Sequence, residues 1–152
     1  MSKNEPDLSY LEGVKILIKK PPIYKSVCNT FGIKDPNACF TFGDTIYNPT
    51  GIDIPEEMIE HEKLHMEQQH HNKKGAALWW GKFLRDPEFR LDQEARAYAV
   101  QYDVVCERVK DRNQRHRYMH IYAMSLSSPL YGNMTSYTVA MHLLRKFSKT
   151  LR

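Results

Sequence analysis

The chain has 152 residues, of which 41% are hydrophobic and 26% charged, and its formal net charge is +4. These values are ordinary for a globular domain with a sizeable core. No apolar run approaches the roughly 20 residues that span a bilayer, and the first residues have no apolar signal core, so we expect a cytoplasmic protein without membrane association. Three widely spaced cysteines (Cys28, Cys39 and Cys106) suit free thiols in a reducing compartment.

The N-terminal part of the chain is predicted to form a small β-structure with one helix. Residues 1–10 read as a flexible tail, and residues 11–152 as a single domain. Val14–Lys19 is short, apolar and β-branched, which indicates a strand. Ile23–Phe31 has apolar residues at helical spacing, and Gly32 can close that helix.

A second β-segment, Ala38–Tyr47, is rich in aromatic and β-branched residues. Gly43 and Asp44 lie in its middle, so the segment is either a strand with a bulge or a tight hairpin. Its place just before the next helix allows two interpretations. The segment is an ordinary core strand, or it lies beside a cleft and pairs with an extended ligand.

From Asp53 onward the pattern predicts helices separated by Gly, Pro and polar residues. Asp53 and Asp86 are the expected N-caps of two of them, each with a proline early in the helix that follows. The aromatic block around Trp79 and Trp80 indicates core packing. The predicted ranges are 53–72, 76–84, 87–110, 113–126 and 136–147. The expected inward face of the last helix consists of Val139, Leu143, Leu144 and Phe147.

The first of these helices carries the pentapeptide His61-Glu62-Lys63-Leu64-His65, which has the pattern H-E-x-x-H. Residues four apart share one face of a helix, so His61 and His65 can offer two imidazole nitrogens to one metal ion. Glu62 is then placed beside the pair to deprotonate a water. A solvated, charged helix would also accommodate these residues, and a catalytic zinc needs a third protein ligand.

One candidate for the third ligand is His71, or its neighbour His70. His71 follows His65 by six positions, as in H-E-x-x-H-x-x-G-x-x-H, but Gln68 stands where that motif has glycine. If the helix continues, His71 lies about 15 Å beyond His61 and is rotated by about 280° from it, too far to reach the same metal.

The other candidate is Glu94, which 28 residues separate from His65. That length allows the chain to leave the first helix, turn through the Trp segment and return. The small residues Ala95 and Ala97, just after Glu94, let helices approach closely, and Asp92 and Glu88 are alternatives on the same helix. The predicted face of that helix consists of Glu94, Tyr98, Gln101 and Val105.

Taken in order, these motifs resemble small gluzincin-like zinc metallopeptidase proteins of bacteriophages and prophages. The features are H-E-x-x-H, the Trp segment, Asp-Pro-Glu-Phe-Arg, Glu-x-x-Ala-Tyr and the loop Ser-Ser-Pro-Leu-Tyr-Gly-Asn. The resemblance implies an α+β, mostly α, zincin-like domain with a small N-terminal sheet. It also implies zinc held by His61, His65 and Glu94, with Glu62 as the catalytic residue. Tyr98 departs from the larger gluzincins, which often have Asp there, so another group must orient a ligand histidine.

The expected function is zinc-dependent hydrolysis of peptide bonds in a peptide or protein substrate, in the host cytoplasm if the chain is phage-encoded. The alternative is a catalytically silent, zinc-stabilised protein-binding module. A nucleic-acid binder that uses the basic run Arg108–Arg117 is a third hypothesis, which we favour least. The sequence leaves open the oligomeric state and the donor to the oxyanion, for which the candidates are Tyr98, Tyr131, Tyr137, His120 and His142.

Overall fold

The computed structural model describes residues 14–71 and 75–151, so the predicted tail, residues 1–10, lies outside it. The fold is α+β and mostly α, as predicted. The strands are β1 (Lys15–Leu17), β2 (Phe40–Phe42) and β3 (Thr45–Tyr47). The helices are α1 (Tyr24–Phe31), α2 (Glu56–His71), α3 (Gly75–Arg85), α4 (Pro87–Arg108), α5 (Arg112–Leu126), the short 3-10 helix η2 (Pro129–Tyr131) and α6 (Tyr137–Phe147).

The three strands form one small sheet in the order β1-β3-β2. β2 and β3 are antiparallel and joined by a two-residue turn, so the hairpin is the correct one of the two predicted alternatives. Gly43 adopts φ +65° in this turn, a conformation that glycine takes without steric cost. β1 pairs with β3 in parallel, which leaves β2 at one edge of the sheet, in contact with α2.

The predicted helix ends agree with the structure to within two residues except at the start of α2, and the predicted end of that helix, at residue 72, lies outside the described residues. Asp86 accepts hydrogen bonds of 3.1 Å from the backbone N–H groups of Glu88 and Phe89, and so caps α4 as expected. Asp53 lies outside α2 and is not its cap. The carbonyl of Pro55 instead accepts the first helical hydrogen bonds, from the N–H groups of Met58 and Ile59. The N–H that proline lacks would have no helical partner at this position, so its absence costs nothing.

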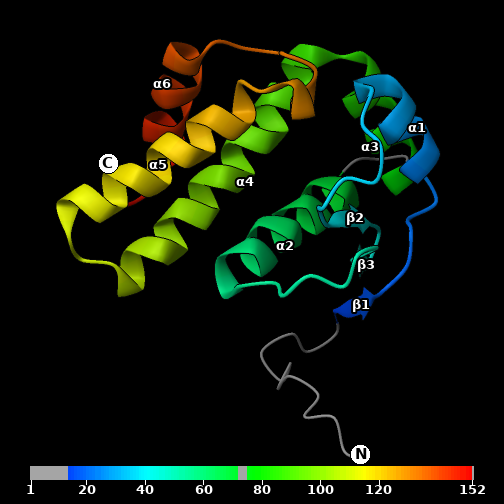
Figure 1. Ribbon diagram of the computed structural model, residues 1–152, viewed down its shortest axis with the longest axis horizontal. Helices are drawn as coiled ribbons and strands as arrows, with labels where there is room; N and C mark the ends of the chain where they lie inside the picture. The colour runs from blue at the N-terminus through cyan, green and yellow to red at the C-terminus, as the bar shows by residue number, and fades with distance from the viewer. Residues whose placement is uncertain (1–13, 72–74, 152) are drawn as a thin grey trace, which may run out of the picture.

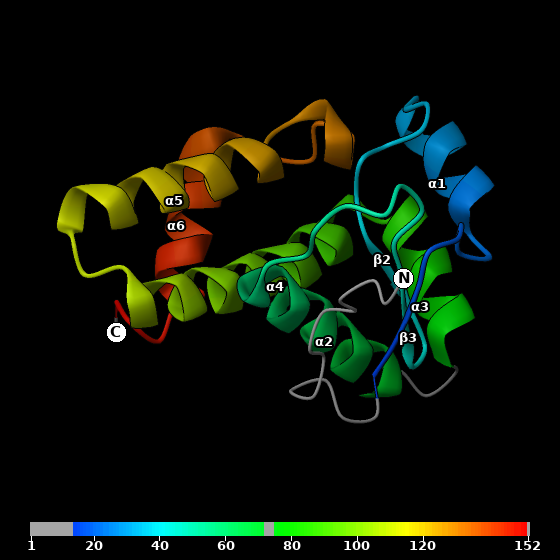
Figure 2. The same cartoon turned by 60° about the horizontal axis from the view of Figure 1, so that its bottom comes forward.

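Helix α4 is the centre of the molecule (Figure 1). It packs against α2 and α3 on one side and against α5 and α6 on the other. The turned view shows the same order, with α5 and α2 on opposite sides of α4 and with α1, α3 and the sheet gathered at one end (Figure 2). α2 therefore lies between the sheet and α4, and a residue on its inner face is enclosed from both directions.

Two clusters of buried apolar residues flank this position. One joins α4, α5 and α6, and the other joins α1, β2 and the aromatic residues Trp79, Trp80 and Phe83 of α3. The predicted core role of the Trp block is thus confirmed. The inward face of α6 is only partly as predicted, because Leu144 is buried but Val139 is 45% exposed. Tyr131 contacts both clusters and marks their junction.

Candidate metal centre

Three polar residues of the H-E-x-x-H motif in helix α2 point into the interior. His61, Glu62 and His65 are 5%, 7% and 4% exposed, which is opposite to the solvated helix that the sequence also allowed. The four-residue spacing places the two imidazoles one turn apart on the face that meets α4, and their Nε2 atoms are 3.1 Å apart. Buried polar side chains need partners, so the neighbouring elements must supply them.

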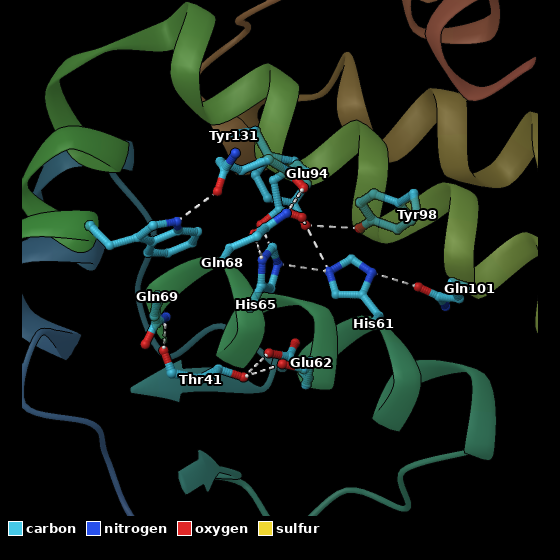
Figure 3. Close-up of polar contacts among 12 residues, drawn as sticks. Thr41, His61, Glu62, His65, Gln68, Gln69, Glu94, Tyr98, Gln101 and Tyr131 are labelled. Atoms are coloured by element: carbon cyan, nitrogen blue, oxygen red, sulfur yellow. Dashed lines mark hydrogen bonds and ion pairs between the residues drawn. The ribbon is translucent and has the colours of Figure 1, made fainter. Parts of the chain in front are cut away.

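Helix α4 supplies a carboxylate at the point where the two imidazoles converge (Figure 3). Glu94 Oε2 is 3.2 Å from His61 Nε2, and Glu94 Oε1 is 3.1 Å from His65 Nε2. One ligand atom from each of the three residues lies within 4.8 Å of the other two, and all three residues are buried. The structure thus brings together the three residues that the sequence selected.

The other candidates for the third ligand are not part of this cluster. His71 is at the exposed end of α2, with 72% of its side chain accessible, and it faces Glu67 at 3.9 Å. His70 is exposed as well. On α4, Asp92 pairs with Arg96, and Glu88 is exposed in the first turn. α2 remains helical through Gln68, so the chain does not turn back at that residue.

Two glutamines fix the proton positions on the imidazoles, and the sequence analysis did not identify either of them. His61 Nδ1 is 2.9 Å from Gln101 Oε1, and His65 Nδ1 is 2.8 Å from Gln68 Oε1. The amide of Gln68 is oriented by its own Nε2, which donates to the carbonyl of Gln93 at 3.1 Å. An amide oxygen only accepts hydrogen bonds, so each Nδ1 donates, and Nε2 is the atom of each ring that is left to bind a metal.

These contacts provide the orienting groups that are missing because Tyr98 stands where larger gluzincins often have Asp. In place of a carboxylate, Gln101 orients His61 from one turn further along α4. Gln68 does the same for His65 from within α2. The three-residue spacing from His65 to Gln68 was a usable signal in the sequence, because residues three apart on a helix are neighbours. The role of Gln101 could not be recognised from the sequence, because its contact with His61 depends on how α2 packs on α4.

Glu94 is the charged partner of both imidazoles. Burial acts to raise the pKa of Glu94, but His65 and His61 outweigh it and hold that pKa well below its usual range. Burial acts to lower the pKa of His65, but Glu94 raises it to about 9, so His65 carries a proton when no metal is bound. Glu94 Oε2 is buried without a hydrogen-bond partner among the described residues. An ionised carboxylate and two imidazole nitrogens directed at one point can hold a metal ion, which takes the place of that proton.

Glu62 points to the other neighbour of α2, the sheet (Figure 3). Its Oε2 accepts a hydrogen bond of 2.6 Å from the Thr41 hydroxyl of β2. Burial raises the pKa of Glu62, although the two histidines and Thr41 act in the opposite direction. A carboxyl with a raised pKa takes up a proton more readily than an ordinary glutamate does.

The edge of β2 is not available at Thr41 for pairing with an extended ligand. Its carbonyl accepts hydrogen bonds from Gln69 Nε2 and Trp80 Nε1, both at 2.8 Å. These two donors occupy both lone pairs of the oxygen. Of the two interpretations of this segment, the structure favours the core strand, because side chains of α2 and α3 cover its edge at this residue.

A cavity of about 70 Å³ opens beside the cluster, and His61, Glu62, His65 and Glu94 all line it. Of the five candidate donors to an oxyanion, Tyr131 is the one among the lining residues. Its hydroxyl is 2.8 Å from that of Tyr98, which packs edge-on against the His61 ring. His120 and Tyr137 bond to each other at 2.8 Å, and His142 is exposed.

The basic run is largely engaged within the chain. Arg108 forms an ion pair of 2.7 Å with a buried carboxylate of α2. Lys110 and Arg115 donate to backbone carbonyls at the end of α4. Only Arg112 and Arg117 of this run are exposed without such a contact among the described residues. Most of the run therefore ties α4 to α2 and α5, as basic side chains near helix ends commonly do.

Comparisons of the chain with protein-family models, with curated proteins and with solved structures gave no match. The resemblance to phage gluzincin-like proteins therefore stays a hypothesis based on the motifs. Within residues 14–71 and 75–151, no helix combines the length and the apolar character needed to cross a membrane.

Proposed function

We propose that this protein is a zinc-dependent hydrolase of peptide bonds, with His61, His65 and Glu94 as metal ligands and Glu62 as general base. The observation that carries the proposal is the buried convergence of two imidazole nitrogens and one carboxylate, with Glu62 on the same cavity. The motif resemblance to gluzincin-like metallopeptidases supports the same assignment.

Zinc is the metal that this donor set suits best. Two histidines and one glutamate form the protein side of many catalytic zinc sites, which keep a further position open. Carboxylate-rich sites without imidazole are more typical of magnesium or calcium. When bound, zinc lowers the pKa of a water molecule towards neutrality and polarises a carbonyl oxygen.

The residues of the chain then carry the proton transfers. Thr41 holds one oxygen of the Glu62 carboxylate at 2.6 Å, so the other oxygen takes the proton from the attacking water. The water oxygen bonds to the carbonyl carbon, the C–N bond breaks, and Glu62 passes the proton to the leaving amine. Burial of Glu62 raises its pKa and makes both transfers accessible.

Tyr131 is the hydrogen-bond donor to the developing oxyanion in this proposal. Burial raises the pKa of Tyr131 well above its usual value, so the phenol keeps its proton. The proposal requires that the Tyr98 hydroxyl, 2.8 Å away, donates to Tyr131, which leaves the Tyr131 O–H group to donate to the oxyanion. Arg90 donates to the Tyr131 carbonyl at 3.1 Å and holds η2 over the cavity.

The first test is the metal content of the purified chain after exposure to zinc. The wild type and His71→Ala, an exposed control on the same helix, should bind about one zinc ion per chain. His65→Ala and Glu94→Ala should lose it. A wild type that binds no zinc would overturn the proposal, and retention of zinc by Glu94→Ala would remove Glu94 from the ligand set.

The second test separates catalysis from binding. Glu62→Gln should keep zinc but no longer hydrolyse peptides, because the amide cannot accept the proton. The assay is cleavage of a mixed peptide library, with the products identified by mass spectrometry. A zinc-loaded wild type that cleaves no peptide in that library would leave the zinc-stabilised binding module as the function. A Glu62→Gln variant that hydrolyses as fast as the wild type would remove Glu62 from the mechanism.

A further inference from the structure

The geometry of the cavity points to a substrate class: we infer that it receives one uncharged aliphatic side chain next to the bond that is cleaved. This inference rests on the proposed hydrolase function. It concerns the walls of the cavity, whereas the proposed function concerns the metal cluster and Glu62 at one side of it.

The walls of the cavity are apolar and come from five separate parts of the chain. α1, the segment before β2, β2 itself, α3 and η2 each contribute to them. Apart from the metal cluster, Glu62 is the one lining residue with a charged side chain. Thr41 engages one oxygen of its carboxylate, and the proposed function needs the other for the attacking water, so a charged substrate group would lose its hydration without gaining a dedicated partner. Apolar lining residues include Val27, Phe31, Ile33, Trp80, Phe83 and Leu130.

The size of the cavity selects among apolar groups. Its volume is about 70 Å³, several times the roughly 15 Å³ that holds one water. The space is therefore limited to a group of a few heavy atoms, such as the four carbons of a leucine or isoleucine side chain. Larger aromatic groups would have to displace Trp80 or Phe83, which are 6% and 3% exposed and tightly packed.

The cavity reaches the surface beside η2 and is held open by a buried arginine. Leu130 lines it and is 37% exposed, which places the entrance there. Arg90, 4% exposed, donates to the carbonyls of Phe83 at 2.7 Å and Tyr131 at 3.1 Å, and so joins the α3 and η2 walls. A pocket that exists before binding loses little entropy when it is filled, which favours selectivity.

Backbone pairing cannot substitute for this pocket at the centre of β2. The Thr41 carbonyl is already bonded to Gln69 and Trp80, and so cannot accept a hydrogen bond from a substrate strand. Recognition next to the metal cluster therefore depends on the side chain that enters the cavity.

The test measures binding of hydroxamates, which ligate zinc directly, to the zinc-loaded full chain by calorimetry. The probes are acetohydroxamate, 4-methylpentanohydroxamate with an isobutyl end, and succinate monohydroxamate with a carboxylate end. Burial of the added carbons should make the isobutyl probe bind at least about tenfold more tightly than acetohydroxamate. The carboxylate probe should gain nothing. Equal affinities for all three would overturn the inference and leave the zinc site intact.

A pair of variants tests whether the gain comes from this cavity. Ala38→Leu adds bulk to the lining and should reduce the advantage of the isobutyl probe to below about threefold, with acetohydroxamate affinity and zinc content unchanged. Ala77→Leu adds the same bulk to an exposed position of α3 and should change nothing. If Ala38→Leu does not fold, Leu130→Trp at the exposed entrance replaces it. An undiminished advantage in the cavity variant would contradict the inference.

The outcomes distinguish this inference from the function on which it rests. Failure to bind zinc removes the proposed function, and the substrate assignment with it. Zinc binding and Glu62-dependent hydrolysis without any preference for an aliphatic side chain would overturn the substrate assignment alone.

Discussion

The glutamine that orients His65 provides the sharpest test of the site. Gln68→Met keeps the length of the side chain and a good helix former but removes the amide oxygen 2.8 Å from His65 Nδ1. His65 Nδ1 then loses the acceptor that orients the ring, while Nε2 still faces Glu94 Oε1 across 3.1 Å. The nitrogen that binds the metal is held less firmly, so zinc should bind more weakly.

The expected loss follows from the contact that is removed. Partners that orient metal-bound histidines typically contribute about 10- to 100-fold in affinity, which is about 1.4–2.7 kcal/mol. Loss of one hydrogen bond to a buried donor costs about 1–3 kcal/mol, which agrees with that range. His65 is 4% exposed, so water does not readily replace the missing amide.

The assay is competition for zinc against a chromophoric chelator, with thermal unfolding measured in parallel to verify the fold. Gln68→Met should raise the zinc dissociation constant about 10- to 100-fold. Gln114→Met, a change at an exposed position of α5, is the matched control and should leave it unchanged. A folded Gln68→Met variant with a dissociation constant within about twofold of the wild type would refute the orienting role.

Three further predictions concern stability. Free zinc at about 100 times its dissociation constant should stabilise the chain by about 2.7 kcal/mol, so a chelator should lower the melting temperature by about 5–10 °C; an unchanged melting temperature would argue against a buried zinc site. Burial acts to raise the pKa of Glu57, but the hydrogen bond from Arg108 outweighs it and lowers that pKa overall. The pair therefore stabilises the fold above the unfolded pKa of about 4.3, and this contribution is lost as the pH falls through the folded value. Arg108→Gln should cost about 1 kcal/mol in urea unfolding at pH 7 and much less at pH 3, whereas exposed Arg112→Gln should cost little at either. Gly132 has φ +75°, and an added Cβ would lie 3.2 Å from an aromatic ring. Gly132→Ala should therefore destabilise more than Gly43→Ala, which shares the positive φ but meets no atom within 4 Å among the described residues; equal losses would mean that the contact carries no cost.

Much of the helical structure is determined by residues that are close together in the sequence. Asp86 and Pro87 start α4 because the carboxylate accepts hydrogen bonds from free N–H groups of the first turn and the proline has no N–H that needs a partner. The spacing of His61 and His65 fixes their common face once α2 is helical. Glu94 was selected from chain length and small neighbours, and the structure places it against both histidines.

Contacts between segments that are distant in the chain could not be predicted from the sequence. Asp53 has the right residue type for a cap, but the chain begins α2 only after Pro55. Val139 has the right spacing for the core, but α5 covers a neighbouring face of α6, where Ala140 and Met141 are buried. Residue type and period define a helix face and leave open the direction from which another helix packs against it.

The sequence by itself determined the pair of histidines, the glutamate between them and the helix that presents them, because all of these depend on residues a few positions apart. Only the tertiary structure decided what surrounds them. Gln101 reaches His61 across 40 residues of chain, and Thr41 reaches Glu62 across 21. The apolar cavity has walls from five segments, and no local pattern encodes their meeting. A metal site needs oriented ligands and an enclosed volume, and both are properties of packing.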